Sequence, residues 1–420
     1  MKEHVQNPRS GGTDRDIRPP IFRVGALLLL CPLYFLLLSC GPAPSGTSSQ
    51  VTVLSGAGYS FSAPTALVSV GGVPWYANSI GNTLVGVSLQ TGYGTSGYTP
   101  ATLSNPLGIS YLSSSDLSDP VAMAVDLSGN LWVVSQKNNS VVSLAISGCF
   151  YYSLGSYDCG AAAYQTKLDT PAAVAADPSG KVWVANQGNN TLLVFSSTTC
   201  AYPCPSSVYS PSGSSGYGET NYATTLYCLS GSSCTAMGSG CVLASPSAMA
   251  SDSSGNIWIL NSSPASLTEV VGGNASTCRN FTASSLSLDN PVALTTDTNG
   301  DLAIVNRGTK TGNDSGSVVY LPAGCTPAAC TPVVLSGSSL GIDQPVSATF
   351  AQNGDLWVAN QGDSSATDLP SVCLSGSSCQ PIIYSGEAYP YGTPTSILPI
   401  GNTLWVLGTN ALVLITPSGP

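Results

Sequence analysis

The stretch GKVWVANQGNNTLLVF, residues 180–195, reads as two apolar runs separated by a polar turn. Val, Trp and Leu in VWVA and TLLVF favour β-strands, and the intervening QGNN is typical of a hairpin turn. The same outline recurs along the chain, each time opened by a Pro and in most cases centred on a Trp. This recurrence predicts a fold built from repeated antiparallel units.

Seven copies of the pattern align on the Pro that opens a strand of small residues. Those Pro residues are Pro64, Pro120, Pro171, Pro246, Pro291, Pro345 and Pro394. The residues 11 or 12 positions further on are Trp75, Trp132, Trp183, Trp258, Ala303, Trp357 and Trp405. All six Trp residues of the protein therefore share one repeat position, which random placement would not produce.

Each copy is predicted to hold three strands, with a fourth just before the next Pro. A strand of this fourth type stands before the first copy at residues 51–54, whereas the third strand of the seventh copy, residues 411–416, has none after it. We expect the N-terminal strand to supply it. The predicted fold is all-β: a seven-bladed β-propeller of four-stranded antiparallel blades, closed by the N-terminal strand pairing into the last blade.

Composition agrees with an all-β chain. Of 420 residues, 43% are hydrophobic and only 8% charged, with 45 Gly and 30 Pro. These values provide a large core and little material for charged helices. The propeller is predicted to span residues 51–420, and a long stapled loop at about 200–241 explains the wide spacing between Pro171 and Pro246.

Residues 1–40 are predicted to be a lipoprotein-type signal segment. Basic residues precede the apolar run VGALLLLCPLYFLLLS, residues 24–39, which is shorter than a membrane span and interrupted by Pro32. The tetrad LLSC, ending at Cys40, resembles a bacterial lipobox, in which the Cys carries the lipid. Residues 41–50 are then a flexible tether, and the alternative is an uncleaved signal anchor. Both interpretations place the remaining chain outside the cytoplasm. The lipid-anchored form is expected in the bacterial cell envelope, at the outer membrane or cell surface.

Cysteine usage agrees with an oxidising compartment. Beyond Cys40 the sequence has 12 Cys, an even number, as a disulfide framework requires. Most of them form pairs that are close in sequence. Cys241 and Cys278 remain and are expected to pair with each other, although sequence alone does not fix the connectivity. The close pairs are Cys149 with Cys159, Cys200 with Cys204, Cys228 with Cys234, Cys325 with Cys330, and Cys373 with Cys379.

The order of Pro, small strand, D-x-x-G and VWVAN resembles NHL-type propeller repeats, and the ring of seven copies is similar to the streptogramin (virginiamycin B) lyases. The resemblance covers nearly all of residues 51–416 and is specific for the fold rather than the activity. NHL-like repeats usually carry Asp where this chain has Asn. The lyase resemblance implies a catalytic His, but the one His of the chain is His4, inside the signal segment. No catalytic residue is predicted.

A second enzyme alternative resembles gluconolactonase, a propeller that uses acidic and Asn side chains around a divalent cation in the axial channel. Four Asp residues just before the strand-opening Pro residues are the candidate Ca²⁺ ligands. They are Asp119, Asp169, Asp289 and Asp343. The competing interpretation is that these Asp side chains bond the local backbone of a turn.

We call the four strands of a blade a to d, where a begins at the Pro and d is the strand just before the next Pro. The connections from strand d to the next strand a and from strand b to strand c emerge on the same face of a propeller. We therefore take this face as the candidate binding face. Its candidate residues are Asn186, Asn261, Asn306, Arg307, Lys310 and Asn360. A second Asp set opens the D-x-x-G turns on the opposite face, where turn formation explains it. That set is Asp126, Asp177, Asp252 and Asp297. The Trp residues are interpreted as core packing between blades.

Charge limits the partners. Beyond Cys40 the chain has 6 Lys and Arg against 18 Asp and Glu, a net charge of −12. Nucleic acid is excluded as a partner, because neutralising phosphates requires many basic residues. The sequence thus predicts a lipid-anchored, monomeric binding scaffold without a cofactor, contacting the membrane only through its anchor, whose partner is a glycan, a peptide or an envelope protein. The Ca²⁺-dependent hydrolase and the lyase remain the alternatives.

Overall fold

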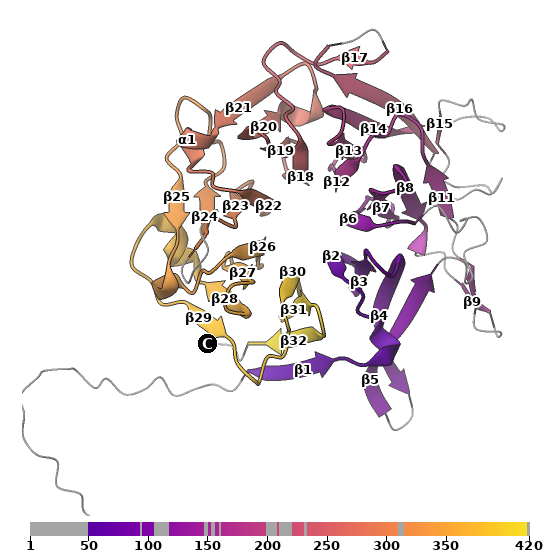
Figure 1. The fold of residues 1–420 in the computed structure, drawn as a ribbon, viewed down its shortest axis with the longest axis vertical. Coiled ribbons are helices and arrows are strands. Elements are labelled where there is room, and N and C mark those ends of the chain that lie inside the picture. The colour runs from indigo at the N-terminus through magenta and orange to yellow at the C-terminus, as the bar shows by residue number, and fades with distance from the viewer. Residues whose placement is uncertain are drawn as a thin grey trace, which may run out of the picture. The chain divides into compact units, whose positions relative to one another are not determined.

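The computed structural model describes residues 49–92, 95–104, 117–146, 150–152, 156–158, 161–198, 208–209, 221–230, 233–309 and 315–417. These residues form a ring of seven blades, each a four-stranded antiparallel sheet (Figure 1). The predicted seven-bladed β-propeller is confirmed. Cys40, Lys310, Cys149, Cys159, Cys200 and Cys204 lie outside the described residues.

Strands a to d of each blade run from the ring axis outward. Blade 1 has β2 (Pro64–Val70), β3 (Val73–Asn78), β4 (Thr83–Gly92) and β5 (Thr95–Ser104). Blade 2 has β6 (Pro120–Val125), β7 (Leu131–Ser135), β8 (Ser140–Leu144) and β11 (Ala161–Tyr164), with the hairpin β9 (Phe150–Tyr152) and β10 (Ser156–Asp158) between its last two strands. Blade 3 has β12 (Pro171–Ala176), β13 (Val182–Asn186), β14 (Thr191–Thr198) and β16 (Asn221–Cys228), with β15 (Val208–Tyr209) and β17 (Thr235–Ala236) beside β16.

The remaining blades follow the same order. Blade 4 has β18 (Pro246–Ser251), β19 (Ile257–Ser262), β20 (Ala265–Val270) and β21 (Cys278–Thr282), followed by the short helix α1 (Ala283–Leu286). Blade 5 has β22 (Pro291–Thr296), β23 (Leu302–Asn306), β24 (Ser317–Leu321) and β25 (Val333–Leu335). Blade 6 has β26 (Pro345–Phe350), β27 (Leu356–Asn360), β28 (Ser365–Leu369) and β29 (Ile382–Tyr384). Blade 7 has β30 (Pro394–Ile400), β31 (Thr403–Gly408), β32 (Leu412–Thr416) and, from the N-terminal side, β1 (Gln50–Leu54).

Two features close the ring. The predicted N-terminal strand β1 pairs antiparallel with β32, with Val53 opposite Val413. The innermost strands contact one another in chain order, and β30 of the last blade contacts β2 of the first. Pairing of the two ends of the propeller leaves no open edge in the ring, as the sequence predicted.

Every innermost strand begins at its Pro. Proline has no backbone N–H, so the first position of a strand is where a sheet tolerates it. In all seven blades the register shifts between this Pro and the residue two positions later. The repeated Pro thus places the same bulge at the start of each blade.

The core is divided among the blade interfaces. The described residues form seven hydrophobic clusters, one between each pair of neighbouring blades. Between blades 2 and 3, for example, Trp132 packs against Phe195 with ring centroids 5.0 Å apart. The second strands are almost wholly buried, since they are covered on both faces, which explains their continuous apolar runs.

The structure differs from the sequence prediction in blade 3. Residues 200–241 were predicted as a stapled loop, but Asn221–Cys228 form strand β16, which pairs with β14 as the outer strand of the blade. Tyr, Thr and Leu in this segment fit a half-buried strand better than a loop. The loop prediction was therefore wrong for these residues.

Four disulfides are present among the described residues: Cys228–Cys234, Cys241–Cys278, Cys325–Cys330 and Cys373–Cys379. All four match the predicted pairs, including the pair left over after the close ones. They indicate an oxidising environment for the propeller. In the part of the chain that is described, no helix has the length and hydropathy to cross a membrane.

Candidate functional site

The predicted binding-face Asn residues are buried. Asn186, Asn261, Asn306 and Asn360 each lie at or next to the end of a second strand, and all four side chains are fully inaccessible to solvent. Asn360 shows what they do: its Nδ2 donates to Gly341 O at 2.9 Å and to the hydroxyl oxygens of Ser365 and Thr367, both at 3.1 Å. Each Asn thus ties its second strand to the third strand or to the chain that enters the blade. These amides are therefore buried within the blades and are not exposed on the predicted binding face.

In blades 3, 4 and 6 the same amides also hold the backbone before the Pro. The backbone N–H groups of Asp169, Ala244 and Asp343 donate to Oδ1 of the Asn in their own blade. Of the remaining predicted residues on this face, Arg307 is exposed. The polar groups that sequence reasoning assigned to a ligand are therefore largely used to shape the blade ends.

The four predicted metal ligands lie on different blades. The carboxylate of Asp169 lies against Gly188 in its own blade, where a Cβ would come within 2.5 Å of it, and Asp343 lies as closely against Gly362. Thr309 N donates to Asp289 Oδ2 at 3.3 Å. No group of three or more His, Cys, Asp or Glu side chains among the described residues is placed to hold a metal ion. Asp119, Asp169, Asp289 and Asp343 are thus not brought together.

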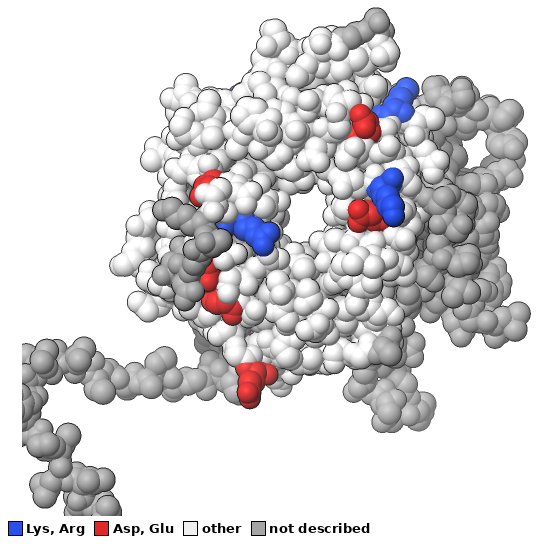
Figure 2. Space-filling view, viewed as in Figure 1, with Lys and Arg blue, Asp and Glu red and all other residues white. Residues whose placement is uncertain are grey.

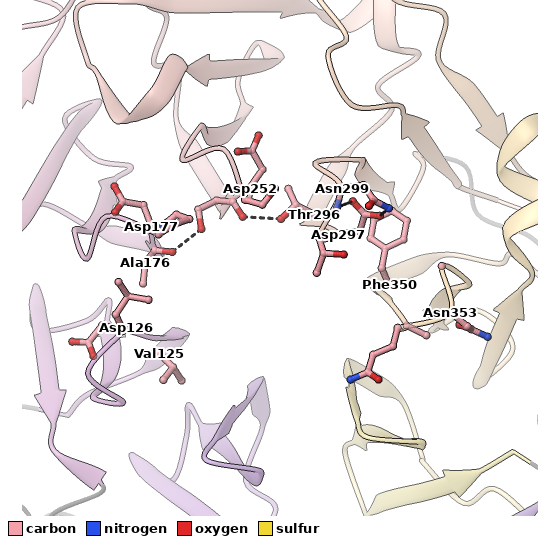
Figure 3. A pocket seen from close by; sticks show the side chains of 18 residues that line it. Val125, Asp126, Ala176, Asp177, Asp252, Thr296, Asp297, Asn299, Phe350 and Asn353 are labelled. Carbon is pink, nitrogen blue, oxygen red and sulfur yellow. Dashed lines mark hydrogen bonds between the residues drawn. The ribbon is translucent and has the colours of Figure 1, made fainter.

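A cavity lies at the opposite face, where strands a turn into strands b. We call this cavity the a–b hollow. Its volume is about 610 Å³, and it is lined by the a–b turns of blades 2 to 6 (Figure 3). Its walls carry exposed apolar groups such as Leu127, which is 70% exposed, and short polar side chains such as Ser253 and Thr298. None of its lining residues is Lys or Arg.

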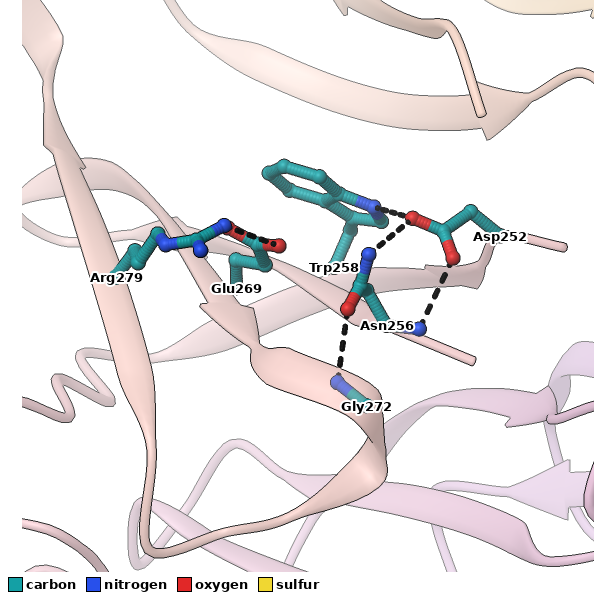
Figure 4. Close-up of polar contacts among 6 residues, drawn as sticks. All are labelled: Asp252, Asn256, Trp258, Glu269, Gly272 and Arg279. Carbon is teal, nitrogen blue, oxygen red and sulfur yellow. Dashed lines mark hydrogen bonds and ion pairs between the residues drawn. The ribbon is translucent and has the colours of Figure 1, made fainter. Parts of the chain in front are cut away.

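Three carboxylates that line the hollow are hydrogen-bonded within the fold. Asp252 accepts hydrogen bonds at Oδ1 from the backbone N–H of Ser254 and Asn256, and at Oδ2 from Trp258 Nε1 at 2.9 Å (Figure 4). In blades 2 and 3, Asp126 and Asp177 bond their Trp indoles in the same way, at 2.8 and 2.9 Å. The three side chains are at most 6% exposed. Buried and saturated with donors, they are unsuited to act as general acids or bases.

The last residue of the a–b turn bonds the connection that follows strand c in the same blade in blades 4, 5 and 6. Gly272 N donates to Asn256 Oδ1 at 2.8 Å in blade 4. In blades 5 and 6, Asp301 and Asp355 accept backbone N–H bonds from Ala323 and Ser371 in the same manner. The turn of blade 4 is therefore fixed at two points, and the turns of blades 2, 3, 5 and 6 are each fixed by at least one side-chain hydrogen bond, which gives the hollow a preformed shape.

Hydroxyl groups also join neighbouring blades around the hollow. Ser251 Oγ donates to Ala176 O at 2.6 Å, and Thr296 Oγ1 donates to Ser251 O at 2.7 Å, as Figure 3 shows.

A second cavity of about 280 Å³ follows the axis and is lined by small residues of the innermost strands, such as Ala122, Ala173 and Ser247. It contains no ionisable lining residue.

Charge is sparse on the surface. In the view of Figure 2 an opening is visible at the centre of the ring, and the few Lys, Arg, Asp and Glu side chains are scattered around it.

Sequence reasoning missed the a–b hollow because it assigned Asp126, Asp177, Asp252 and Asp297 to turns alone. The available signal was the Trp six residues after Asp126, Asp177 and Asp252, a spacing that pairs carboxylate with indole.

No protein-family model matches the chain, and no curated protein matches it. Several solved structures do. Virginiamycin B lyase from Staphylococcus aureus, as a catalytically inactive histidine-to-alanine variant with quinupristin, superposes with a TM-score of 0.59 at 14% identity, covering 88% of this chain and 99% of that one. A streptogramin B lyase gives 0.59 at 12% identity over 88% and 98% of the chains, and hydrazine synthase from Kuenenia stuttgartiensis gives 0.55 at 13% over 89% and 98%.

These similarities establish the class of fold and nothing finer. The chain is a seven-bladed β-propeller similar in fold to the streptogramin B lyases. At 12 to 14% identity, activity does not transfer between such chains.

Proposed function

We propose that this protein is a non-enzymatic binding propeller of the cell envelope that holds its partner at the a–b hollow. The observation that carries the proposal is the construction of the hollow. Five blades contribute fixed turns to a concavity of about 610 Å³, and its rim presents exposed apolar and neutral polar side chains. A preformed concavity of mixed polarity is a typical binding site.

The distribution of ionisable groups supports binding rather than catalysis. The buried carboxylates of Asp126, Asp177 and Asp252 are occupied by backbone and indole donors, and no His lies beyond His4. One of the lyases above is inactive when a His is replaced, so the lack of His in the propeller argues against that chemistry here. The lack of basic lining residues favours a neutral partner such as a glycan or an uncharged peptide segment.

Two matched substitutions test the proposal. The full chain, in a detergent without a sugar headgroup, is probed on an array of glycans and peptides. Ser253→Trp fills the hollow, whereas Ser262→Trp places the same bulk on the opposite face of the same blade; both serines are exposed. We expect array binding that Ser253→Trp abolishes and Ser262→Trp preserves. Binding lost only with Ser262→Trp, or no binding at all, would overturn the proposal.

The location is part of the same proposal. Four disulfides and the predicted lipobox support a propeller tethered outside the cytoplasm through a lipid on Cys40. Growth with a labelled fatty acid in a bacterial host should label the wild type and leave Cys40→Ser unlabelled. Equal membrane retention of an unlabelled wild type would instead indicate an uncleaved signal anchor.

A further inference from the structure

Blades 5 and 6 break the repeat on the same wall of the hollow. In blade 5, Ala303 replaces the Trp, and in blade 6, Ala351 replaces the Asp that bonds a Trp elsewhere. The last residue of the innermost strand is small in blades 2 to 5 but is Phe350 in blade 6. Departures from a repeat that otherwise serves the fold point to a local function.

The missing Trp leaves a carboxylate oxygen available. Asp297 Oδ1 accepts the turn N–H groups of Asn299 and Asp301, both at 2.8 Å, as its counterparts do. Among the described residues, its Oδ2 accepts a hydrogen bond only from the side chain of Asn299, at 2.9 Å, in place of an indole. Asp297 is also half-buried, whereas Asp126, Asp177 and Asp252 are buried. A half-buried carboxylate with an unused acceptor position on Oδ2 therefore belongs to the lining of the hollow, where Figure 3 labels it with Asn299 and Phe350.

An aromatic ring lines the same cavity as this carboxylate. Phe350 lines the hollow and packs on Tyr320, with ring centroids 6.5 Å apart at 66°. Tyr320 is the cross-strand neighbour of Ala303 and is held by a 2.8 Å hydrogen bond from its hydroxyl to Asp301 Oδ2. The side chain opposite the missing Trp thus supports the ring of Phe350 from behind.

Exposed amides complete this wall. Asn299 and Gln352 are both exposed lining residues, and Gln352 has no hydrogen-bond partner among the described residues. An aromatic face, a carboxylate and exposed amides are the groups that match a sugar ring, which has an apolar face and a rim of hydroxyl donors and acceptors.

We propose that this wall, formed by Asp297, Asn299, Phe350 and Gln352, is a subsite for a neutral saccharide. The inference rests on the proposed function and names its ligand class. The sugar ring packs on Phe350, its hydroxyls donate to Asp297 Oδ2, and the amides of Asn299 and Gln352 bond the remaining hydroxyls. Anionic sugars are rejected, because the hollow has carboxylates and no basic lining residue.

The test uses the full chain in the same detergent, with cellohexaose, chitohexaose and maltohexaose as neutral probes and hexagalacturonate as the anionic probe. Binding is measured by calorimetry. Asp297→Asn removes the charge and keeps an acceptor for the turn, Phe350→Leu keeps an apolar contact with Tyr320, and Gln352→Ala removes an exposed amide. The control is Asp363→Asn, an exposed carboxylate on the opposite face. Thermal melting confirms that each variant folds.

We expect at least one neutral hexasaccharide to bind, about tenfold more weakly to Asp297→Asn and to Phe350→Leu, and equally to Asp363→Asn. Binding of hexagalacturonate with similar affinity, or neutral binding unaffected by the three wall variants, would overturn the inference. If no hexasaccharide binds but a peptide binds and Ser253→Trp blocks it, the saccharide subsite is wrong and the proposed binding function is supported. If neither saccharides nor peptides bind, the saccharide subsite and the proposed binding function are both wrong.

Discussion

Trp183 Nε1 donates a hydrogen bond of 2.9 Å to Asp177 Oδ2, joining the buried second strand of blade 3 to the turn that precedes it. The indole is 1% exposed and the carboxylate 3%. The same bond occurs in blades 2 and 4. The Trp of the repeat therefore does two things: it fills the space between blades, and it fixes the a–b turn that forms the wall of the hollow.

Trp183→Phe should destabilise the protein by more than the loss of ring volume explains. The change leaves Asp177 Oδ2 buried without its donor, at a cost of about 1–3 kcal/mol. Trp75→Phe is the matched control, because Trp75 Nε1 is buried without a hydrogen-bond partner among the described residues. Urea unfolding should show a larger loss for Trp183→Phe by about 2 kcal/mol. Equal losses would show that packing alone explains the repeat.

Asn360→Ala should reduce stability and leave binding intact. The side chain is fully buried and bonds Gly341, Ser365 and Thr367. Its removal leaves several buried polar groups without a partner, so the free energy of unfolding should fall by about 3 kcal/mol in total. The exposed Asn189→Ala should change the free energy of unfolding by less than about 0.5 kcal/mol. Saccharide affinity measured well below the melting temperature should be unchanged in both. A selective loss of affinity in Asn360→Ala would restore the b–c face as the binding site.

The pH dependence of stability should reflect Asp368. Burial, followed by the nearby Asp355, raises the pKa of Asp368 from 3.8 to about 7. The folded protein then holds this proton more tightly than the unfolded chain, so the contribution to stability is fully present below about pH 4 and is lost as the pH rises through about 7. The melting temperature should fall across this window in the wild type and much less in Asp368→Asn. A slope that survives in Asp368→Asn but disappears in Asp363→Asn would contradict the assignment.

Calcium should leave the melting temperature unchanged. The carboxylates of Asp289 and Asp343 lie on separate blades, and neither belongs to a group of three or more candidate ligands among the described residues. Scanning calorimetry of the full chain with CaCl₂ and then with EDTA should give superimposable transitions. A calcium-dependent rise that disappears in Asp289→Ala or Asp343→Ala would instead support a calcium-dependent propeller hydrolase.

The fold could be read from the sequence because its signals repeat. Seven strand-opening Pro residues and a shared Trp position report on local strand order, and the strand at residues 51–54 showed how the ring closes. Strand β16 was missed since its segment lies in the irregular insertion of blade 3, where no repeat signal identifies the outer strand. Repetition therefore predicts the common part of each blade and not its additions.

The candidate site was harder to predict, for a physical reason. An Asn at a strand end can face a ligand or cap its own blade, and only the burial of residues such as Asn186 separates the two. In the second Asp set, two residues with different environments looked alike in the sequence. Turn formation explains both Asp252 and Asp297, but of these two carboxylates only that of Asp252 is bonded to an indole. The difference between those two carboxylates depends on the residue six positions later and on the packing of Tyr320, which a one-dimensional pattern does not contain.

The central claim is that the a–b face, and not the b–c face, holds the partner. Hydrogen–deuterium exchange of the full chain with and without a bound neutral hexasaccharide tests it most directly. We predict slower exchange in the a–b turns at residues 297–300 and 351–354, with no change in the b–c turns at residues 187–190 and 361–364. Slower exchange confined to the b–c turns would contradict the account.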